Sequence, residues 1–264
     1  MIDTSFIILG ATGLIGSAVR EHLETLGARV IPVGSKDYPD RIGAQADVLI
    51  NCNGNAVRYL ARQNPTWDFE ASVATVHRSL FDFKYGLYIY VSTVDVYNAP
   101  DDPSRNHEAV PIRQGELDVY AFHKWTAERL VERFAGRSVI ARVGTAIGNG
   151  IKKNPVYDLL NGHPLHMSLE SELSLIDTPT IARCLETIIR ARPEREIINV
   201  TARGYVKLRD IQQRLGTPVS LAPGAEEVVH RYNVNTAKMA RLMPLPTSWE
   251  ALTAYLECSS MRQP

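Results

Sequence analysis

The stretch "SFIILGATGLIGSAVREHLETLG" (residues 5–27) decides the fold. It begins with a short apolar run, which is typical of a β-strand buried on both faces. A turn with three glycines follows, and apolar residues then recur at helical spacing until Gly27, where the predicted helix ends. The stretch therefore predicts a strand, a tight turn and a helix in immediate succession.

The same alternation continues along the first half of the chain. We expect further strands at 28–34, 46–54, 87–93 and 138–144. We expect further helices at 66–83 and 119–135. Apolar strands that alternate with helices predict a parallel sheet covered by helices on both faces. We therefore expect an α/β fold, a Rossmann-type doubly wound parallel sheet, in residues 1–147.

The residue pattern of the sequence changes after Gly148. In the segments 148–172 and 204–264, glycine and proline residues interrupt short predicted helices and strands. We therefore expect a small C-terminal substrate-binding lobe there. Residues 173–203 are expected to return in part to the sheet. The later predicted elements are a strand at 196–202 and helices at 178–191, 205–216 and 234–243. Residues 258–264 are expected to form a loose tail.

Composition narrows the class of partner. The 264 residues include 29 Lys and Arg and 29 Asp and Glu, so no overall field attracts nucleic acid or an acidic membrane. No apolar run approaches the roughly 20 residues that span a bilayer, and the first residues resemble a mature protein rather than a signal peptide. Three cysteines without paired spacing argue against a disulfide framework or a zinc site, and no metal is expected. We expect a cytoplasmic protein with neither nucleic-acid nor membrane partners.

Gly10, Gly13 and Gly16 are spaced three residues apart between the first strand and its helix. Glycines at this spacing let the backbone approach a pyrophosphate, and the helix N-terminus supplies amide donors. The alternative is a tight turn that needs glycine only for its backbone angles. We favour a dinucleotide site. Its predicted contacts also include the intervening residues Thr12, Leu14 and Ile15.

The end of the second strand should discriminate between NAD and NADP. A carboxylate at this position would bind the free hydroxyls of the adenine ribose. The sequence has Ser35 and Lys36 instead, which suit a 2′-phosphate. We therefore favour NADP, and the adjacent Asp37 leaves NAD open.

Tyr120 and Lys124 lie four residues apart in "DVYAFHK" (118–124), so they share one face of the predicted helix. Taken alone, such a pair is most often a solvated surface pair. With the glycine turn upstream and a Ser-Thr at a strand end between them, a catalytic pair is favoured.

Together these motifs resemble the extended short-chain dehydrogenase/reductase family, the NAD(P)-dependent epimerases and dehydratases. The resemblance covers nearly the whole chain, is strongest before residue 130, and is weak after residue 150. It is carried by "GATGLIG" (10–16), "NCNG" (51–54), "STVDVY" (92–97), "NHEAVP" (106–111) and "YAFHKWTAE" (120–128).

The resemblance implies a role for each matching residue. Tyr120 would be the general acid/base, with its pKa brought towards neutrality by Lys124 and the nicotinamide ring, and Lys124 would also hold the nicotinamide ribose. Thr93 would hydrogen-bond the substrate oxygen. The other implied contacts are Asn53 and Gly54 for the cofactor and, for the substrate, Ser92, Asp95 and Lys152.

The implied activity is hydride transfer at a hydroxyl or keto carbon of a nucleotide-activated sugar or similar polar substrate, by a reductase or an epimerase. A dehydratase is the first alternative, although only Asp95 remains of the acid pair that family dehydratases carry after the threonine. A non-catalytic NADP sensor on the same fold is the second.

Three further expectations follow. Helices 67–83 and 119–135 are those that family members often use to pair as dimers, so we predict a homodimer through them. His123 is expected at the surface or in an interface, and His163 and His166 are not expected to bind a metal. Because only about a dozen residues separate the second and third strands, the sheet should be narrow at the adenine edge.

Overall fold

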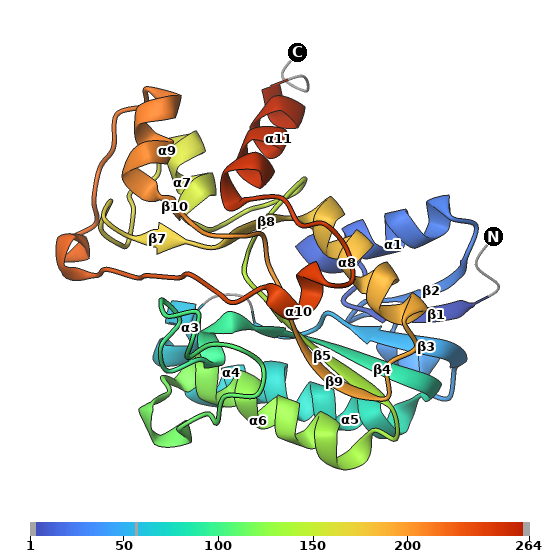
Figure 1. The fold of residues 1–264 in the computed structure, drawn as a ribbon. Helices are drawn as coiled ribbons and strands as arrows, with labels where there is room; N and C mark the ends of the chain where they lie inside the picture. Colours follow the sequence, from blue (N-terminus) through green and yellow to red (C-terminus); the bar gives the residue numbers. More distant parts are fainter. Residues whose placement is uncertain (1–3, 56–57, 261–264) are drawn as a thin grey trace.

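The computed structural model describes residues 4–55 and 58–260. Within them, one parallel sheet has the strand order β2-β1-β3-β4-β5-β9 (Figure 1). Every neighbouring pair in this sheet is parallel. The predicted α/β doubly wound fold is therefore confirmed. The strands are β1 (Ser5–Leu9), β2 (Arg29–Val33), β3 (Gln45–Asn51), β4 (Lys84–Thr93), β5 (Ser138–Val143) and β9 (Arg195–Val200).

Helices cover both faces of this sheet (Figure 1). The helices α1 (Leu14–Thr25) and α8 (Thr178–Arg190) pack side by side on one face. The other face carries α4 (Pro65–Phe69), a π-helical turn (Glu70–Ala74), α5 (Thr75–Asp82) and α6 (Val119–Phe134). Two separate hydrophobic clusters fill the two interfaces.

Alternation along β1 explains how one strand serves both clusters. Phe6 and Ile8 point to the face under α1 and α8, whereas Ile7 and Leu9 point to the face under α5 and α6. All four side chains are fully buried. An unbroken apolar run is therefore required at this position.

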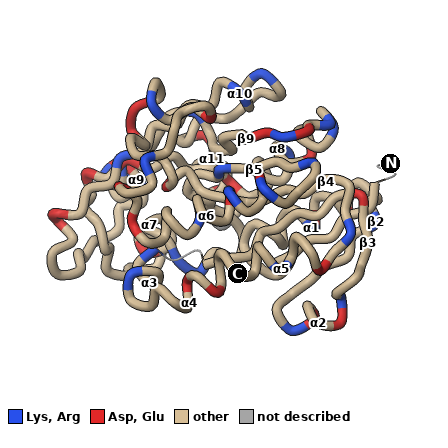
Figure 2. The backbone as a smooth tube through the Cα atoms, turned by 90° about the horizontal axis from the view of Figure 1, so that it is seen from below, with Lys and Arg blue, Asp and Glu red and all other residues tan. Residues whose placement is uncertain are grey.

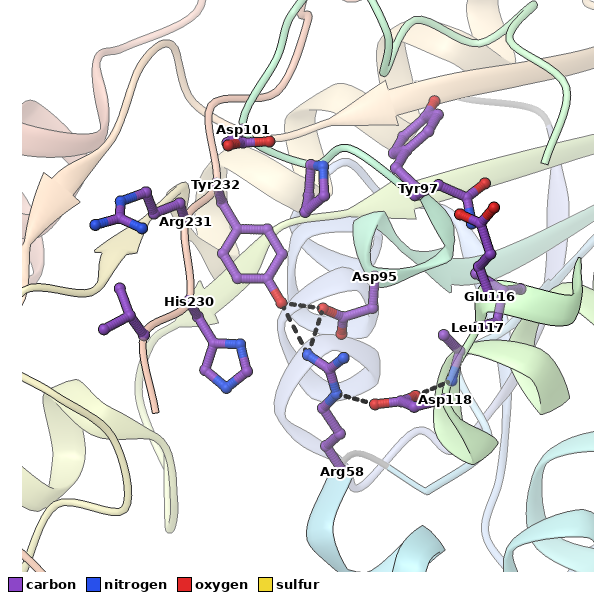
Figure 3. A pocket seen from close by; sticks show the side chains of 14 residues that line it. Arg58, Asp95, Tyr97, Asp101, Glu116, Leu117, Asp118, His230, Arg231 and Tyr232 are labelled. Carbon is purple, nitrogen blue, oxygen red and sulfur yellow. Dashed lines mark hydrogen bonds and ion pairs between the residues drawn. The ribbon is translucent and has the colours of Figure 1, made fainter. Parts of the chain in front are cut away.

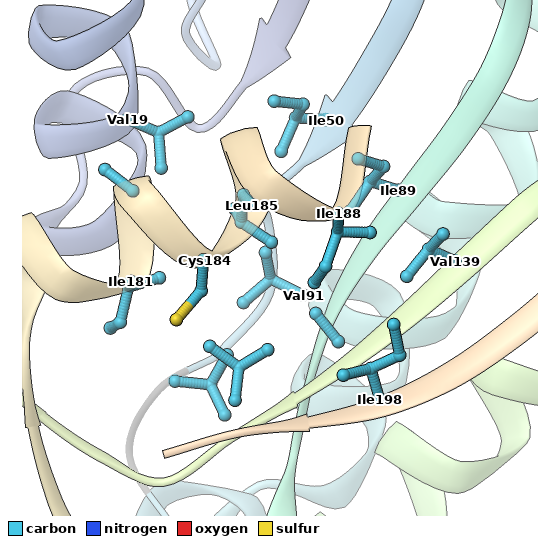
Figure 4. Packing of buried hydrophobic residues seen from close by; sticks show 14 of the residues in the cluster. Val19, Ile50, Ile89, Val91, Val139, Ile181, Cys184, Leu185, Ile188 and Ile198 are labelled. Carbon is cyan, nitrogen blue, oxygen red and sulfur yellow. The ribbon is translucent and has the colours of Figure 1, made fainter. Parts of the chain in front are cut away.

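The helix α8 shows the complementary pattern on the helical side. Its buried residues Ile181, Cys184, Leu185 and Ile188 recur at a spacing of three and four, which forms one apolar stripe. Figure 4 shows this stripe facing side chains of β3, β4, β5 and β9. Cys184 is thus a core residue, as its sequence surroundings indicate.

The remaining elements form a smaller lobe beyond the carboxyl ends of the strands (Figure 1). Its core includes Val156, Leu159, Leu173, Val206 and Leu252. Its elements are β6 (Thr145–Ile147), α7 (Pro155–Asn161), β7 (Glu172–Leu173), β8 (Leu175–Asp177), β10 (Val206–Lys207), α9 (Leu208–Leu215) and α11 (Ser248–Ser260). The short helix α10 (Ala237–Ala240) packs against β9 instead. Two short two-stranded sheets, β10-β7 and β6-β8, hold it together.

Several predicted boundaries were wrong. The helix expected at 66–83 is interrupted by the π-helical turn, and the helix expected at 234–243 is reduced to α10. Residues 258–260, expected in a loose tail, continue α11, because that helix packs Ala251 and Leu252 into the core. The last part of the expected tail, 261–264, lies outside the described residues.

The connection between β2 and β3 contains only the four-residue helix α2 (Tyr38–Arg41). Strand β2 is the edge of the sheet, with no strand beyond it among the described residues. The positions of basic and acidic residues are interspersed along the backbone tube in Figure 2. No helix in the described part of the chain is both long and apolar enough to span a bilayer.

A buried ion pair ties α6 to the sheet. Arg142 of β5 donates from Nε to Glu128 Oε1 at 3.0 Å and from Nη2 to Glu128 Oε2 at 2.7 Å. Ser92 of β4 donates to the same Glu128 Oε1 at 2.6 Å. Glu128 is fully buried and Arg142 is 1% exposed, so neither charge is solvated by water.

Glu128→Gln leaves the buried Arg142 guanidinium without a countercharge. We expect the free energy of unfolding, measured by urea denaturation, to fall by about 3–5 kcal/mol. The matched control is Glu132→Gln on the same helix, which breaks the half-exposed Arg129–Glu132 pair and should cost less than about 1 kcal/mol. Equal losses in the two variants would contradict this account of α6.

Candidate active site

The glycine turn between β1 and α1 has the shape of an anion site. Gly10 has φ +73°, and a Cβ built on Gly16 would lie 2.2 Å from the Gly10 carbonyl oxygen, so only glycine fits either position. Gly13 is the N-cap residue of α1 and makes no side-chain cap. No acidic residue occupies the first turn, where Leu14 and Ile15 begin the helix. The first amides of α1 therefore suit a pyrophosphate.

The loop after β3 lies against this turn. A Cβ on Gly10 would lie 2.8 Å from Asn53 Oδ1, and a Cβ on Gly54 would lie 3.3 Å from Lys124 Nζ. The structure therefore brings the glycine turn, Asn53, Gly54 and Lys124 together along the carboxyl ends of β1, β3 and β4. A dinucleotide laid across these strand ends would meet all of them.

Thr93, Tyr120 and Lys124 lie in one buried group. Thr93 is the last residue of β4, and Tyr120 and Lys124 lie on α6, whose N-cap Asp118 accepts from the amide of Ala121 at 2.9 Å. The three residues are 8%, 8% and 6% exposed. The side chain of Thr93 lies close enough to the Tyr120 phenol to lower its pKa slightly.

Two groups of β4 contact the Lys124 ammonium. It donates to the carbonyl of Val91 at 3.2 Å, and Nζ lies 5.0 Å from the centroid of the Tyr90 ring. Burial lowers the pKa of Lys124 to about 8, and Glu128 and Asp68 act against this by favouring the cation.

The expected lowering of the Tyr120 pKa requires the nicotinamide ring as well as Lys124 and stays a prediction, whereas the protein's own groups act in the opposite direction. Burial, followed by the carboxylates of Asp95 and Asp68, raises the pKa of the Tyr120 phenol. Arg58 and the polar side chain of Thr93 lower it by less. Desolvation of the phenolate therefore outweighs nearby cations, and Tyr120 is a neutral phenol at pH 7.

A cavity of about 350 Å³ opens beside this group, between the sheet and the small lobe (Figure 3). Asp95 lines the cavity, whereas Thr93 and Tyr120 are not among the lining residues. Asp95 Oδ2 accepts from Thr93 Oγ1 at 3.0 Å, and Asp95 Oδ1 accepts from the hydroxyl of Tyr232. Asp95 thus connects the cavity to the buried group.

The other predicted site residues are placed differently. Ser92 donates to Glu128, which directs its hydroxyl into the buried ion pair and away from the cavity. Lys152 is exposed and does not line the cavity. Ser35 and Lys36 are exposed after the end of β2, and a Cβ on Gly34 would lie 3.3 Å from Asp37 Oδ2.

The sequence interpretation missed Arg58 and Tyr232, which line the cavity and contact Asp95. It was wrong about His123, which is 8% exposed and pairs through Nδ1 with the fully buried Asp68 at 2.6 Å. Helix α4 covers the face of α6 that was expected to be open. The histidines at 163 and 166 belong to no metal-binding cluster among the described residues.

Lys124→Met tests whether burying this ammonium is costly. The ordinary pKa of lysine is 10.5, so between pH 8 and 10.5 the unfolded chain holds a proton that the folded chain has lost. Stability therefore rises with pH in that window, and at pH 7 the buried cation is a cost. We expect Lys124→Met to raise the free energy of unfolding at pH 7 by about 1–3 kcal/mol. The gain should disappear above pH 10.5.

Denaturant titrations at several pH values measure this, with the exposed Lys84→Met as a control that gives no gain. A variant at position 124 that is less stable than the natural chain at pH 7 would show that the ammonium is a net structural contact.

Comparison with known proteins supports the fold. Solved structures with the same fold include MoeE5 in complex with UDP-glucuronic acid and NAD (15% identity, TM-score 0.82, 98% of this chain and 100% of that chain). A UDP-galactose 4-epimerase is similar (20% identity, TM-score 0.80, 98% and 100%). So is the dTDP-4-dehydrorhamnose reductase of Bacillus anthracis with NADP (16% identity, TM-score 0.74, 97% and 98%).

No curated protein sequence matches the chain. The model of the NAD dependent epimerase/dehydratase family, however, matches residues 6–159, which is more than half of the chain. The matched segment contains the glycine turn, Thr93, Tyr120 and Lys124. The chain therefore belongs to the NAD-dependent epimerase/dehydratase family and is an NAD(P)-dependent enzyme of the extended short-chain dehydrogenase/reductase type.

Proposed function

We propose that the chain is a reductase or epimerase that transfers hydride at a hydroxyl or keto carbon of a nucleotide-activated sugar. The observation that carries the proposal is the buried group of Thr93, Tyr120 and Lys124 at the end of β4. A Tyr–Lys pair on the surface would be solvated by water. Here both groups are shielded from water and lie next to the cavity that reaches Asp95.

The proposed chemistry assigns one task to each residue. A bound NAD(P) supplies or accepts the hydride. Tyr120, held as a neutral phenol, donates its proton to the substrate oxygen during reduction and takes one back during oxidation. Thr93 holds the same oxygen, and the Lys124 ammonium stabilises the phenolate that Tyr120 becomes. The raised pKa of Tyr120 favours the form that donates a proton, which suits reduction of a keto group.

A sugar nucleotide is proposed because the cavity is small and strongly polar. Arg58, Asp95, Asp118 and Tyr232 line it, and they offer both donors and acceptors to hydroxyl groups. Arg58 is already paired with Asp118 and Asp95. A neutral hexose therefore fits this set better than an anionic sugar does. UDP-glucose is bound by the related structure of MoeE5.

We propose NADP as the preferred cofactor on the strength of Lys36 and Ser35. Both are exposed after the end of β2, where the adenine ribose lies in a Rossmann fold. Asp37 is the competing group, because its carboxylate lies near Gly34. The three free cysteines suit the reducing compartment that we propose, the cytoplasm.

Dehydration is the second candidate function. Asp95 places a carboxylate one hydrogen bond from Thr93, where it can take a proton from a substrate carbon. A sensor without catalysis is disfavoured, because the Thr93, Tyr120 and Lys124 group would have no task in it.

Turnover with a panel of substrates decides among these candidates. The protein is mixed with NADPH or NADH and 4-keto sugar nucleotides, and nicotinamide absorbance is followed; UDP-glucose and UDP-galactose are tested for epimerisation and dehydration by NMR. We expect Tyr120→Phe to lower kcat by at least about 100-fold while dinucleotide affinity is unchanged. The exposed Tyr59→Phe is the matched control.

Activity that survives Tyr120→Phe would refute the assignment of this tyrosine. Tight dinucleotide binding without turnover of any substrate would favour the sensor. Tighter binding of NADH than of NADPH would overturn the cofactor preference.

We also propose that two copies of the chain pair through α5 and α6. These helices expose a cluster of aromatic rings, in which Phe81 is 61% exposed and Phe134 is 45% exposed. Their ring centroids lie 5.4 Å apart, and the ring of His77 lies 5.5 Å from Phe134. A contiguous aromatic cluster of this kind is typical of an interaction surface, and a second copy of the same helix pair is its proposed occupant.

Sedimentation velocity tests this pairing. We expect a dimer for the natural chain and a monomer for Phe81→Glu, because the introduced carboxylate would be desolvated opposite its own copy. The control is Leu242→Glu, since Leu242 is 40% exposed after α10, a helix that packs Met239 into the cluster on the other face of the sheet. A monomeric natural chain would contradict the proposal.

A further inference from the structure

We propose that Arg58 is a positioning residue that joins the small lobe to the reactive tyrosine, through Tyr232 on one side and through Asp95 and Asp118 on the other. The inference rests on the proposed role of Tyr120. It concerns a residue that lies outside the glycine turn and outside the group of Thr93, Tyr120 and Lys124. Figure 3 shows the four side chains converging on one point of the cavity wall.

Arg58 lies at the start of α3 (Arg58–Gln63), and its guanidinium contacts three partners from three other segments. Nε donates to Asp118 Oδ2. Nη1 donates to the hydroxyl of Tyr232 at 3.2 Å and lies 3.6 Å from Asp95 Oδ1. The hydroxyl of Tyr232 donates in turn to Asp95 Oδ1. The side chain of Arg58 is 33% exposed, so these pairs are partly shielded from water.

Two of these partners lead directly to the reacting groups. Asp118 is the N-cap of α6, and its other oxygen accepts from the amide of Ala121, next to Tyr120. Asp95 uses its other oxygen to accept from Thr93 at 3.0 Å. Arg58 therefore fixes both the start of the helix that carries Tyr120 and the carboxylate that orients Thr93.

The third partner belongs to the small lobe. Tyr232 is 9% exposed, and its amide donates to the carbonyl of Glu172 at 3.0 Å. The amide of Asn233 donates to the carbonyl of Pro100 at 2.8 Å, which ties the same segment to the loop after β4. Tyr232 and Thr93 both donate to the carboxylate of Asp95. A shift of the small lobe therefore moves, through Tyr232, the carboxylate that accepts from Thr93.

Tyr120 is faced by charged or titratable groups from every element around it. Asp95 lies on the turn after β4, Asp68 on α4, Arg58 on α3 and Tyr90 on β4, and Lys124 follows on the same helix. After burial, Asp95 and Asp68 are the largest causes that raise the pKa of Tyr120, and Arg58 lowers it. Removing Arg58 therefore leaves two carboxylates less compensated beside the phenol.

The test compares four variants of the full-length chain, with a sugar nucleotide that the natural protein oxidises. In this direction activity rises with pH as Tyr120 loses its proton. We expect Arg58→Met to move this limb of the kcat profile upward by about one pH unit or more. Arg58→Lys should restore most of the limb, because it keeps the charge. Tyr232→Phe should raise KM without moving the limb.

Arg62→Met is the matched control. Arg62 reaches the same Asp118 at 3.4 Å, but its side chain is 63% exposed, and it contacts neither Asp95 nor Tyr232. We expect it to leave the pH limb and KM unchanged. A shift as large as that of Arg58→Met would show that any nearby cation suffices, which would overturn a positioning role for Arg58.

Hydrogen exchange gives a readout that needs no turnover. The amides of Tyr232 and Asn233 should exchange faster in Arg58→Met and in Tyr232→Phe than in the natural chain, and unchanged exchange in Arg62→Met is expected. If the natural chain turns over no substrate, the proposed function fails. The hydrogen-exchange measurement then decides by itself whether Arg58 joins the small lobe to the region around Tyr120. Unchanged exchange in Arg58→Met, or an unmoved pH limb in an active chain, would overturn it.

Discussion

Burial of the Lys124 ammonium is the constraint on which the surrounding structure depends. A cation removed from water needs nearby compensation, which here comes from the carboxylates of Glu128 and Asp68. Each carboxylate is itself buried and needs its own partner. Arg142 pairs with Glu128, and His123 pairs with Asp68. The buried lysine is thus accompanied by two further contacts, the Arg142–Glu128 ion pair and the His123–Asp68 hydrogen bond, which join α6 to β5 on one side and to α4 on the other.

The same burial shifts the pKa values of two neighbouring residues in opposite directions. A low-dielectric site disfavours charge, so it holds the Tyr120 phenol neutral and makes the Lys124 proton easier to lose. The carboxylates around them raise the pKa of both groups. Desolvation by the protein itself therefore causes both shifts, and the small lobe contributes through Tyr232, which donates to the carboxylate of Asp95.

Local features of the site could be predicted from the sequence, whereas contacts between distant segments could not. The glycine turn, the strand end at Thr93 and the Tyr120–Lys124 spacing each depend on a few consecutive residues, and the sequence places them correctly along the fold. Arg58 and Tyr232 meet across 174 positions, and no periodicity carries that information. His123 was misjudged because helical spacing gives the face of α6 but does not reveal that α4 covers this face.

The strand order has a consequence for how the chain acquires its fold during synthesis. Strand β9 and helix α8 complete the sheet and cover one of its faces, yet both follow the first half of the small lobe in the chain. Until they leave the ribosome, β5 has an unpaired edge, and much of the apolar face of β3 and β4 is open to water. Chains that end before residue 200 thus lack this cover, and an open apolar face beside an unpaired strand edge favours aggregation.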